Sequence, residues 1–107
     1  MRYDIMRIIC FFDLPTETLK QKRMYRYFRK TLISNGFEML QYSVYVRTCP
    51  NRVFAKKFYK RITEKSPGEG HIRLLTVTEK QFEDMMLIIG EKAKQEEKIG
   101  ANRMVIL

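Results

Sequence analysis

Asp13 is the residue of this chain whose type and position could perform chemistry. It follows an almost continuously apolar run, Ile8 to Phe12, that is rich in β-branched and aromatic residues. Such a run predicts a strand buried on both faces, which is usually a central strand. Pro15 has no backbone donor, so the strand should end close to Asp13. A carboxylate here is either a turn residue that accepts backbone hydrogen bonds or a ligand of a hard cation such as Mg²⁺ or Mn²⁺, and residue chemistry alone favours the turn residue.

The metal interpretation is of interest because a divalent ion can neutralise a phosphate and activate water for phosphodiester hydrolysis. The rest of the chain offers little competing chemistry. His71 is the only histidine, and Cys10 and Cys49 have no metal-binding spacing, which disfavours a zinc site and histidine-based acid–base catalysis. We expect both cysteines to be reduced thiols, and the scattered glycines form no phosphate-binding loop.

Two helices and several strands are expected to position Asp13. A first strand is predicted over residues 5–13. Thr18 and Gln21 have capping-box spacing, so a helix should begin at Thr16 or Thr18 and end at Asn35-Gly36. Its buried stripe is predicted at Met24, Tyr25, Phe28 and Leu32. The stretch over 37–47 is predicted to form two strands, in preference to one bent strand. The remaining predicted elements are a helix from Pro50-Asn51 to Lys65, a strand over 71–77, a short helical turn after Thr78, and strands at 86–89 and 103–107.

This order of elements predicts an α+β fold, a ferredoxin-like sandwich with extra C-terminal strands, forming a single domain over residues 1–107. Both helices would cover one sheet face, although the first strand is apolar on both faces. A second copy of the chain is the economical cover for the bare face, which predicts a two-fold dimer. The terminal strand at 103–107 would then pair with a sheet edge, which can belong to the partner subunit.

The predicted dimer bears directly on Asp13, because one carboxylate rarely holds a metal ion alone. Asp13 shares its side-chain parity along the strand with Ile5, Ile9 and Phe11. If that face meets the partner, Asp13 can face its own copy, and the two chains together supply two carboxylates.

Positive charge is concentrated in one part of the chain. Of the net +9, residues 20–73 carry fourteen Lys/Arg and three acids, a balance of +11, and the rest carries seven bases and nine acids, a balance of −2. Such a segment indicates a polyanionic partner: nucleic acid first, an anionic membrane surface second, with a merely solvated basic face as the third alternative. No apolar run approaches the ~20 residues needed to span a bilayer and no signal peptide is evident, so we expect a cytoplasmic protein. The candidate phosphate-binding residues are Lys20, Lys22, Arg23, Arg26, Lys56 and Lys60.

Several motifs, in their order and spacing, resemble the CRISPR-associated protein 2 family, the small subunit of the spacer-acquisition machinery, and most closely its type II members. The resemblance spans essentially the whole chain, and Phe12 stands where many members have tyrosine. The motifs are Phe12-Asp13-Leu14-Pro15, the basic first helix, Gly36-Phe37, Gln41-Tyr42-Ser43-Val44-Tyr45, and Leu75-Thr76-Val77-Thr78-Glu79-Lys80-Gln81-Phe82.

The resemblance implies a ferredoxin-like homodimer whose C-terminal strand packs on the partner's sheet. It also implies a place between dimers of the CRISPR integrase nuclease, where the protein holds duplex protospacer DNA. Some members are described as metal-dependent endonucleases on RNA or DNA that use the aspartate matching Asp13, with Mg²⁺ or Mn²⁺ as cofactor.

We therefore consider two hypotheses about the function. One is a DNA-binding scaffold that contacts phosphates without reading sequence, and the other is a metal-dependent endonuclease with Asp13 as ligand. A single-strand RNA binder using sheet aromatics is a weaker candidate, because the aromatic signature of RNA-recognition motifs is missing. We favour the scaffold with a nuclease centre at Asp13.

Overall fold

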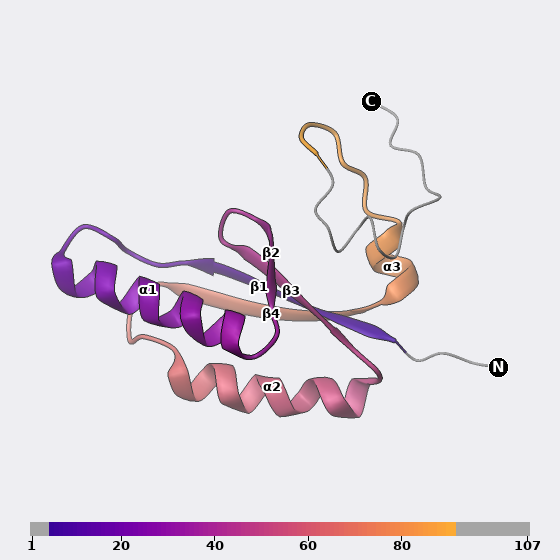
Figure 1. Cartoon of the computed structure of the whole chain (residues 1–107), viewed down its shortest axis with the longest axis horizontal. Helices are drawn as coiled ribbons and strands as arrows, with labels where there is room; N and C mark the ends of the chain where they lie inside the picture. Colours follow the sequence, from indigo (N-terminus) through magenta and orange to yellow (C-terminus); the bar gives the residue numbers. More distant parts are fainter. Residues whose placement is uncertain (1–4, 92–107) are drawn as a thin grey trace.

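A computed structural model describes residues 5–91 of the chain (Figure 1). Asp13 is the last residue of a strand that has a neighbouring strand on each side. The four strands form one antiparallel sheet in the order β2-β3-β1-β4, which is the ferredoxin-like order. The elements in chain order are β1 (Met6–Asp13), α1 (Leu19–Ser34), β2 (Glu38–Gln41), β3 (Val44–Cys49), α2 (Arg52–Lys65), β4 (His71–Thr78) and α3 (Glu79–Glu83).

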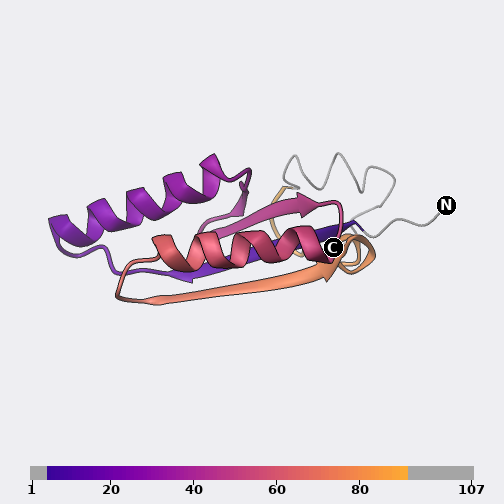
Figure 2. The ribbon, with the colours of Figure 1, turned by 90° about the horizontal axis from the view of Figure 1, so that it is seen from below.

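Helices α1 and α2 lie on the same side of the sheet, as predicted (Figure 2). The core between the two layers is centred on Phe12, whose ring packs edge-on against Phe28 with the ring centres 5.4 Å apart. The ring centres of Tyr25 and Tyr45 lie 5.8 and 5.6 Å from that of Phe12. Aromatic contacts of this kind favour one arrangement of the layers, because each ring pair has a preferred geometry. They therefore fix the end of β1 relative to α1.

Local signals explain where the helices begin. The Thr18 hydroxyl accepts from the Gln21 backbone N–H at 3.0 Å, and the Gln21 side chain accepts from the Thr18 backbone N–H at 3.0 Å. This is a complete capping box, which satisfies two otherwise unpaired donors. The same arrangement between Thr78 and Gln81 begins α3, and the Asn51 side chain caps α2.

The stretch over 37–47 contains two strands, which confirms the choice of two strands over one bent strand, and the chain turns at Tyr42-Ser43. Ser43 has a φ of +63°, which is uncommon for a residue other than glycine. Its carbonyl accepts a hydrogen bond from the Phe12 backbone N–H at 3.1 Å. The turn is thereby tied to β1, one residue before Asp13.

Two predictions about local structure were wrong. Met24 is 37% exposed rather than part of the buried stripe of α1, because the stripe faces the sheet through Phe28, Thr31 and Leu32. Residues 86–89 form no strand. They are apolar enough for one, but no described strand pairs with them, and a strand requires a hydrogen-bonded neighbour.

The predicted strand at 103–107 lies outside the described residues. Within residues 5–91, no helix has the length and apolar character needed to cross a bilayer.

Candidate functional site

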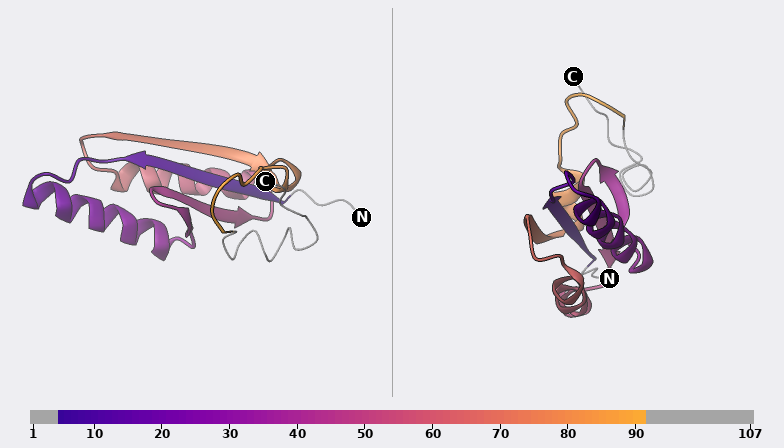
Figure 3. Two further views of the ribbon diagram at one scale, coloured as in Figure 1. Left: turned by 90° about the horizontal axis from the view of Figure 1, so that it is seen from above. Right: turned by 90° about the vertical axis from the view of Figure 1, so that its left-hand side faces the viewer.

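Asp13 is exposed at the end of β1 and borders an open hollow of about 250 Å³. β4 runs antiparallel along the whole of β1, so that the end of one strand lies beside the start of the other (Figure 3). In this register Asp13 is directly opposite His71, and Phe11 is opposite Arg73. The hollow is lined by Phe11, Phe12, Asp13, Ser43, Val44, His71 and Arg73.

The hollow lies on the sheet face that the two long helices leave bare. Ile8, Cys10 and Phe12 belong to the core beneath the helices, whereas Ile9 packs with Val46 and Phe82 in a separate, smaller cluster. Asp13 has the parity of Ile9, so it belongs to the bare face. The alternation predicted this shared parity and left open which face the helices cover. Phe11 and Leu75 on this face are 39% and 50% exposed. These apolar side chains are where a partner surface would fit.

Gly70 holds the backbone at Asp13 in place. It has a φ of +87°, and a Cβ added there would lie 2.5 Å from the Asp13 carbonyl oxygen and 2.9 Å from Cδ2 of Leu14. Only glycine combines this backbone conformation with such a close approach. The turn before β4 therefore determines where the carboxylate lies.

Replacing Gly70 with alanine is expected to destabilise the protein by more than about 1 kcal/mol, because the new Cβ meets backbone and the positive φ is strained. It should also shift the Asp13 backbone amide signal in an NMR spectrum. Gly68→Ala is the matched control, since no atom lies within 4 Å of a Cβ built there. Urea denaturation of both variants checks the prediction. Equal stabilities for the two variants would contradict it.

The positions of His71 and Arg73 were not predicted from the sequence. Both are exposed and border the same hollow as Asp13. Directly opposed residues in an antiparallel pair have Cβ atoms about 4.5–5.5 Å apart, and diagonal ones remain within reach of long side chains. The hollow thus combines a carboxylate, an imidazole and a guanidinium. Only the β1–β4 register brings them together.

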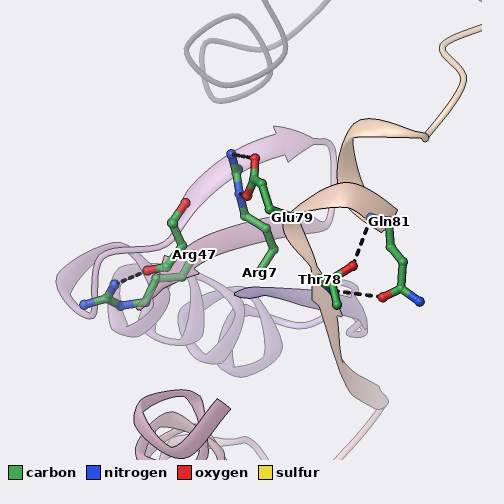
Figure 4. Close-up of polar contacts among 6 residues, drawn as sticks. Arg7, Arg47, Thr78, Glu79 and Gln81 are labelled. Atoms are coloured by element: carbon green, nitrogen blue, oxygen red, sulfur yellow. Dashed lines mark hydrogen bonds and ion pairs between the residues drawn. The ribbon is translucent and has the colours of Figure 1, made fainter. Parts of the chain in front are cut away.

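Arg7 is a third residue whose place was not predicted from the sequence. It lies on the face of β1 that the two long helices leave bare, but Phe82 of α3 packs against it, and its side chain is only 1% exposed. Its Nε donates to Glu79 Oε1 at 2.8 Å and its Nη2 to Oε2 at 3.2 Å (Figure 4). The guanidinium carbon also lies 4.2 Å from the centre of the Phe82 ring. A charge inside an apolar strand was the available signal, because buried arginine requires a partner.

The donor set around Asp13 suits part of a metal site. Within residues 5–91, no group of three or more His, Cys, Asp and Glu side chains is placed to hold a metal ion. Asp13 and His71 are nevertheless opposite one another, which provides one oxygen and one nitrogen donor from a single chain. Water and a second copy of the chain would have to complete such a site.

The two cysteines fit the prediction of reduced thiols without a chemical role. Both are free and buried. Burial raises the pKa of Cys10 to about 12. Burial also raises the pKa of Cys49, against the opposing effect of Arg47. A nucleophilic thiol must ionise near neutral pH, so neither cysteine is suited to nucleophilic catalysis.

The predicted phosphate-binding residues are all exposed, and they form the outer surface of the helical layer. Lys60 Nζ lies 3.9 Å from Glu64 Oε1. Both side chains are exposed, so this contact neutralises little of the lysine charge. α1 carries Lys20, Lys22, Arg23 and Arg26, and α2 carries Lys56 and Lys60. The structure thus gathers these cations on the helices and does not bring them to the bare face that carries Asp13.

A groove of about 450 Å³ separates the C-terminal parts of α1 and α2. Its cations are Lys30, Arg61 and Lys65, which lie beside Tyr27 and Glu64. Lys30, Arg61 and Lys65 therefore extend the positive surface of the helical layer beyond the predicted set.

Comparisons with known proteins agree with the resemblance in the motifs. A sequence model of the family described as CRISPR associated protein Cas2 matches residues 6–85. A CRISPR-associated endoribonuclease Cas2 from Ligilactobacillus salivarius is 47% identical over 95% of this chain and all of its own length. Proteins of the same name from Acidovorax ebreus and Streptococcus mutans are 41% and 46% identical, covering 94% and 81% of this chain and 99% and 80% of their own.

Proposed function

Because this chain belongs to the CRISPR associated protein Cas2 family, we propose that it is a nucleic-acid-binding scaffold of CRISPR spacer acquisition with a metal-dependent phosphodiesterase centre at Asp13. The observation that carries this proposal is the exposed Asp13 carboxylate, beside Arg73, in an open hollow on an apolar sheet face. In this role the protein holds protospacer duplex DNA together with the integrase nuclease, in the cytoplasm.

The centre forms in a homodimer. The bare face exposes Phe11 and Leu75. In a two-fold dimer the same face of each copy packs against the other, so the apolar side chains of both chains are buried in one interface. Asp13 lies on the same face, so a two-fold axis that passes close to it would bring its two copies together. Two carboxylates then share the binding of Mg²⁺ or Mn²⁺, which one alone would hold weakly.

Asp13 and Arg73 have different roles in the hollow. A divalent ion bound there would neutralise phosphate charge and activate a water molecule. Asp13 supplies a carboxylate for the ion from the rigid end of a strand. Arg73, in the same hollow, is able to bind a phosphate oxygen of the substrate through its N–H groups. The hollow is open, so a phosphodiester backbone can reach both side chains.

The helical layer supplies the binding surface for duplex DNA. Its exposed lysines and arginines are suited to phosphate contacts, which position a duplex without reading its sequence. The integrase subunit would contact apolar surface elsewhere. The segment after α3 offers such a surface, where Met86, Ile88 and Ile89 are 71%, 66% and 87% exposed.

Removing three charges from α1 in the variant Lys20→Gln/Lys22→Gln/Arg23→Gln is expected to weaken duplex binding. The slope of log affinity against log salt concentration should fall by up to about 2.7 per protomer, since each lost phosphate contact removes about 0.9. The control is Lys80→Gln, which removes an exposed charge from α3, outside the helical layer, and should leave the slope nearly unchanged. Fluorescence anisotropy at several salt concentrations measures both. A triple variant whose slope equals that of Lys80→Gln would contradict the assignment to α1.

A stand-alone endoribonuclease, or an endonuclease on DNA, is the second candidate. The names of the relatives favour the former, because they are called endoribonucleases. The test is a cleavage time course on labelled duplex DNA and single-stranded RNA with Mg²⁺, Mn²⁺ or EDTA. We expect cleavage that requires metal, and cleavage of RNA alone would support the endoribonuclease. If metal and EDTA give the same result, the phosphodiesterase centre is excluded.

A further inference from the structure

We propose that His71 is a second metal ligand at the Asp13 centre, and that its imidazole makes this centre bind Mn²⁺ in preference to Mg²⁺. This inference rests on the proposed function, because it assumes that Asp13 binds a divalent ion. It adds a ligand from this chain and the identity of the preferred ion.

The register of the sheet brings Asp13 and His71 together. Asp13 and His71 are paired directly across β1 and β4, so their side chains leave the sheet on the same face. Both side chains are exposed and both line the same hollow. With Cβ atoms about 4.5–5.5 Å apart, a carboxylate oxygen of Asp13 and an imidazole nitrogen of His71 could both reach one ion.

The backbone holds the pair close together. Gly70 directly precedes His71, and it packs so tightly against Asp13 that a Cβ would lie 2.5 Å from the Asp13 carbonyl oxygen. The start of β4 therefore cannot move away from the end of β1 without losing this contact. Two ligands on paired strands are positioned more accurately than ligands on loops.

Charge in the hollow also favours a neutral second ligand. Arg73 lines the same hollow, and its positive charge opposes the binding of a cation to a single carboxylate. A neutral imidazole adds a donor without adding positive charge. Within residues 5–91 no third acid, cysteine or histidine joins Asp13 and His71 in a metal-binding group, so His71 is the neighbour available to share the ion.

The nature of the donor predicts the ion. Mg²⁺ prefers an octahedral set of oxygens and dehydrates reluctantly, whereas imidazole suits ions of the first transition series. A centre built only from Asp13 carboxylates and water should show little preference for Mn²⁺. A centre that includes His71 should bind Mn²⁺ more tightly.

Metal binding without turnover tests the inference. The free Mn²⁺ signal in electron paramagnetic resonance measures Mn²⁺ affinity, and competition by Mg²⁺ gives the ratio of the two affinities. In His71→Gln we expect Mn²⁺ affinity to fall by at least about 10-fold, as for the loss of a metal-site contact, while Mg²⁺ affinity changes less. His71→Asp is the matched variant, because it keeps a ligand but replaces nitrogen with oxygen. It should restore metal binding without the preference for Mn²⁺.

The outcomes separate this inference from the proposed function. If His71→Gln keeps the wild-type ratio of Mn²⁺ to Mg²⁺ affinity while Asp13→Asn loses both metals, His71 is not a ligand and the Asp13 centre stands. If Asp13→Asn retains both metals and metal-dependent cleavage, the centre itself is elsewhere and the inference falls with it. His71 is exposed, so its variants should fold, and circular dichroism confirms this before the titrations.

Discussion

Replacing Asp13 with asparagine is expected to reduce metal-dependent cleavage of nucleic acid by more than about 100-fold. Loss of supporting contacts at metal sites costs 10- to 100-fold, and loss of the ligand itself should cost more. Asparagine keeps the size and the exposed position of the side chain, so the fold and the dimer should remain intact. A cleavage time course with saturating Mg²⁺ or Mn²⁺ measures the effect, after the oligomeric state of both proteins has been checked.

The chain offers a close control for this variant. Glu17 is also exposed, lies in the turn between β1 and α1, and does not line the hollow. Glu17→Gln therefore removes the same charge nearby and should leave cleavage unchanged. If Asp13→Asn and Glu17→Gln retain equal metal-dependent activity, Asp13 is a turn residue and not a ligand.

Replacing Glu79 with alanine is expected to destabilise the protein by about 3–5 kcal/mol, because it leaves the charge of Arg7 buried without its partner. Arg7 is 1% exposed and Glu79 17% exposed, so the arginine is the member that water cannot reach. Arg7→Met should cost less, since methionine fills the space beside Phe82 and Glu79 can turn towards solvent. Urea denaturation of the single variants and of Arg7→Met/Glu79→Ala gives the three free energies of unfolding.

The order of these three values is the test. The double variant should be more stable than Glu79→Ala alone, because removing the arginine removes the unpaired charge. Arg7 already has one guanidinium nitrogen, Nη1, without a hydrogen-bond partner within residues 5–91. If Arg7→Met costs as much as Glu79→Ala, the ion pair stabilises the fold through mutual attraction and not through compensation of a buried charge.

Much of the fold could be predicted because the signals are local. The capping boxes at Thr18 and Thr78 lie within four consecutive residues each, and the apolar run before Asp13 marks a central strand wherever it occurs. That Asp13 shares a face with Ile9 and Phe11 also followed from alternation along one strand. These features require no knowledge of what the strand packs against.

The composition of the site could not be predicted in the same way. His71 and Arg73 meet Asp13 only through the β1–β4 register, which depends on how the whole sheet assembles. Arg7 was overlooked for a similar reason, since its partner Glu79 is distant in sequence. The strand expected at 86–89 shows the opposite error. Its residues have the right propensity, but propensity provides no partner strand.

Mixed dimers test most directly the central claim that two copies of Asp13 form one nuclease centre. Wild-type protein is co-refolded with Asp13→Asn protein in different proportions, and metal-dependent cleavage is measured at constant total protein. If both carboxylates are required, activity follows the square of the wild-type fraction, so an equal mixture retains about one quarter of wild-type activity. Activity proportional to the wild-type fraction, with about one half remaining in the equal mixture, would show that each chain acts alone and would contradict a shared centre.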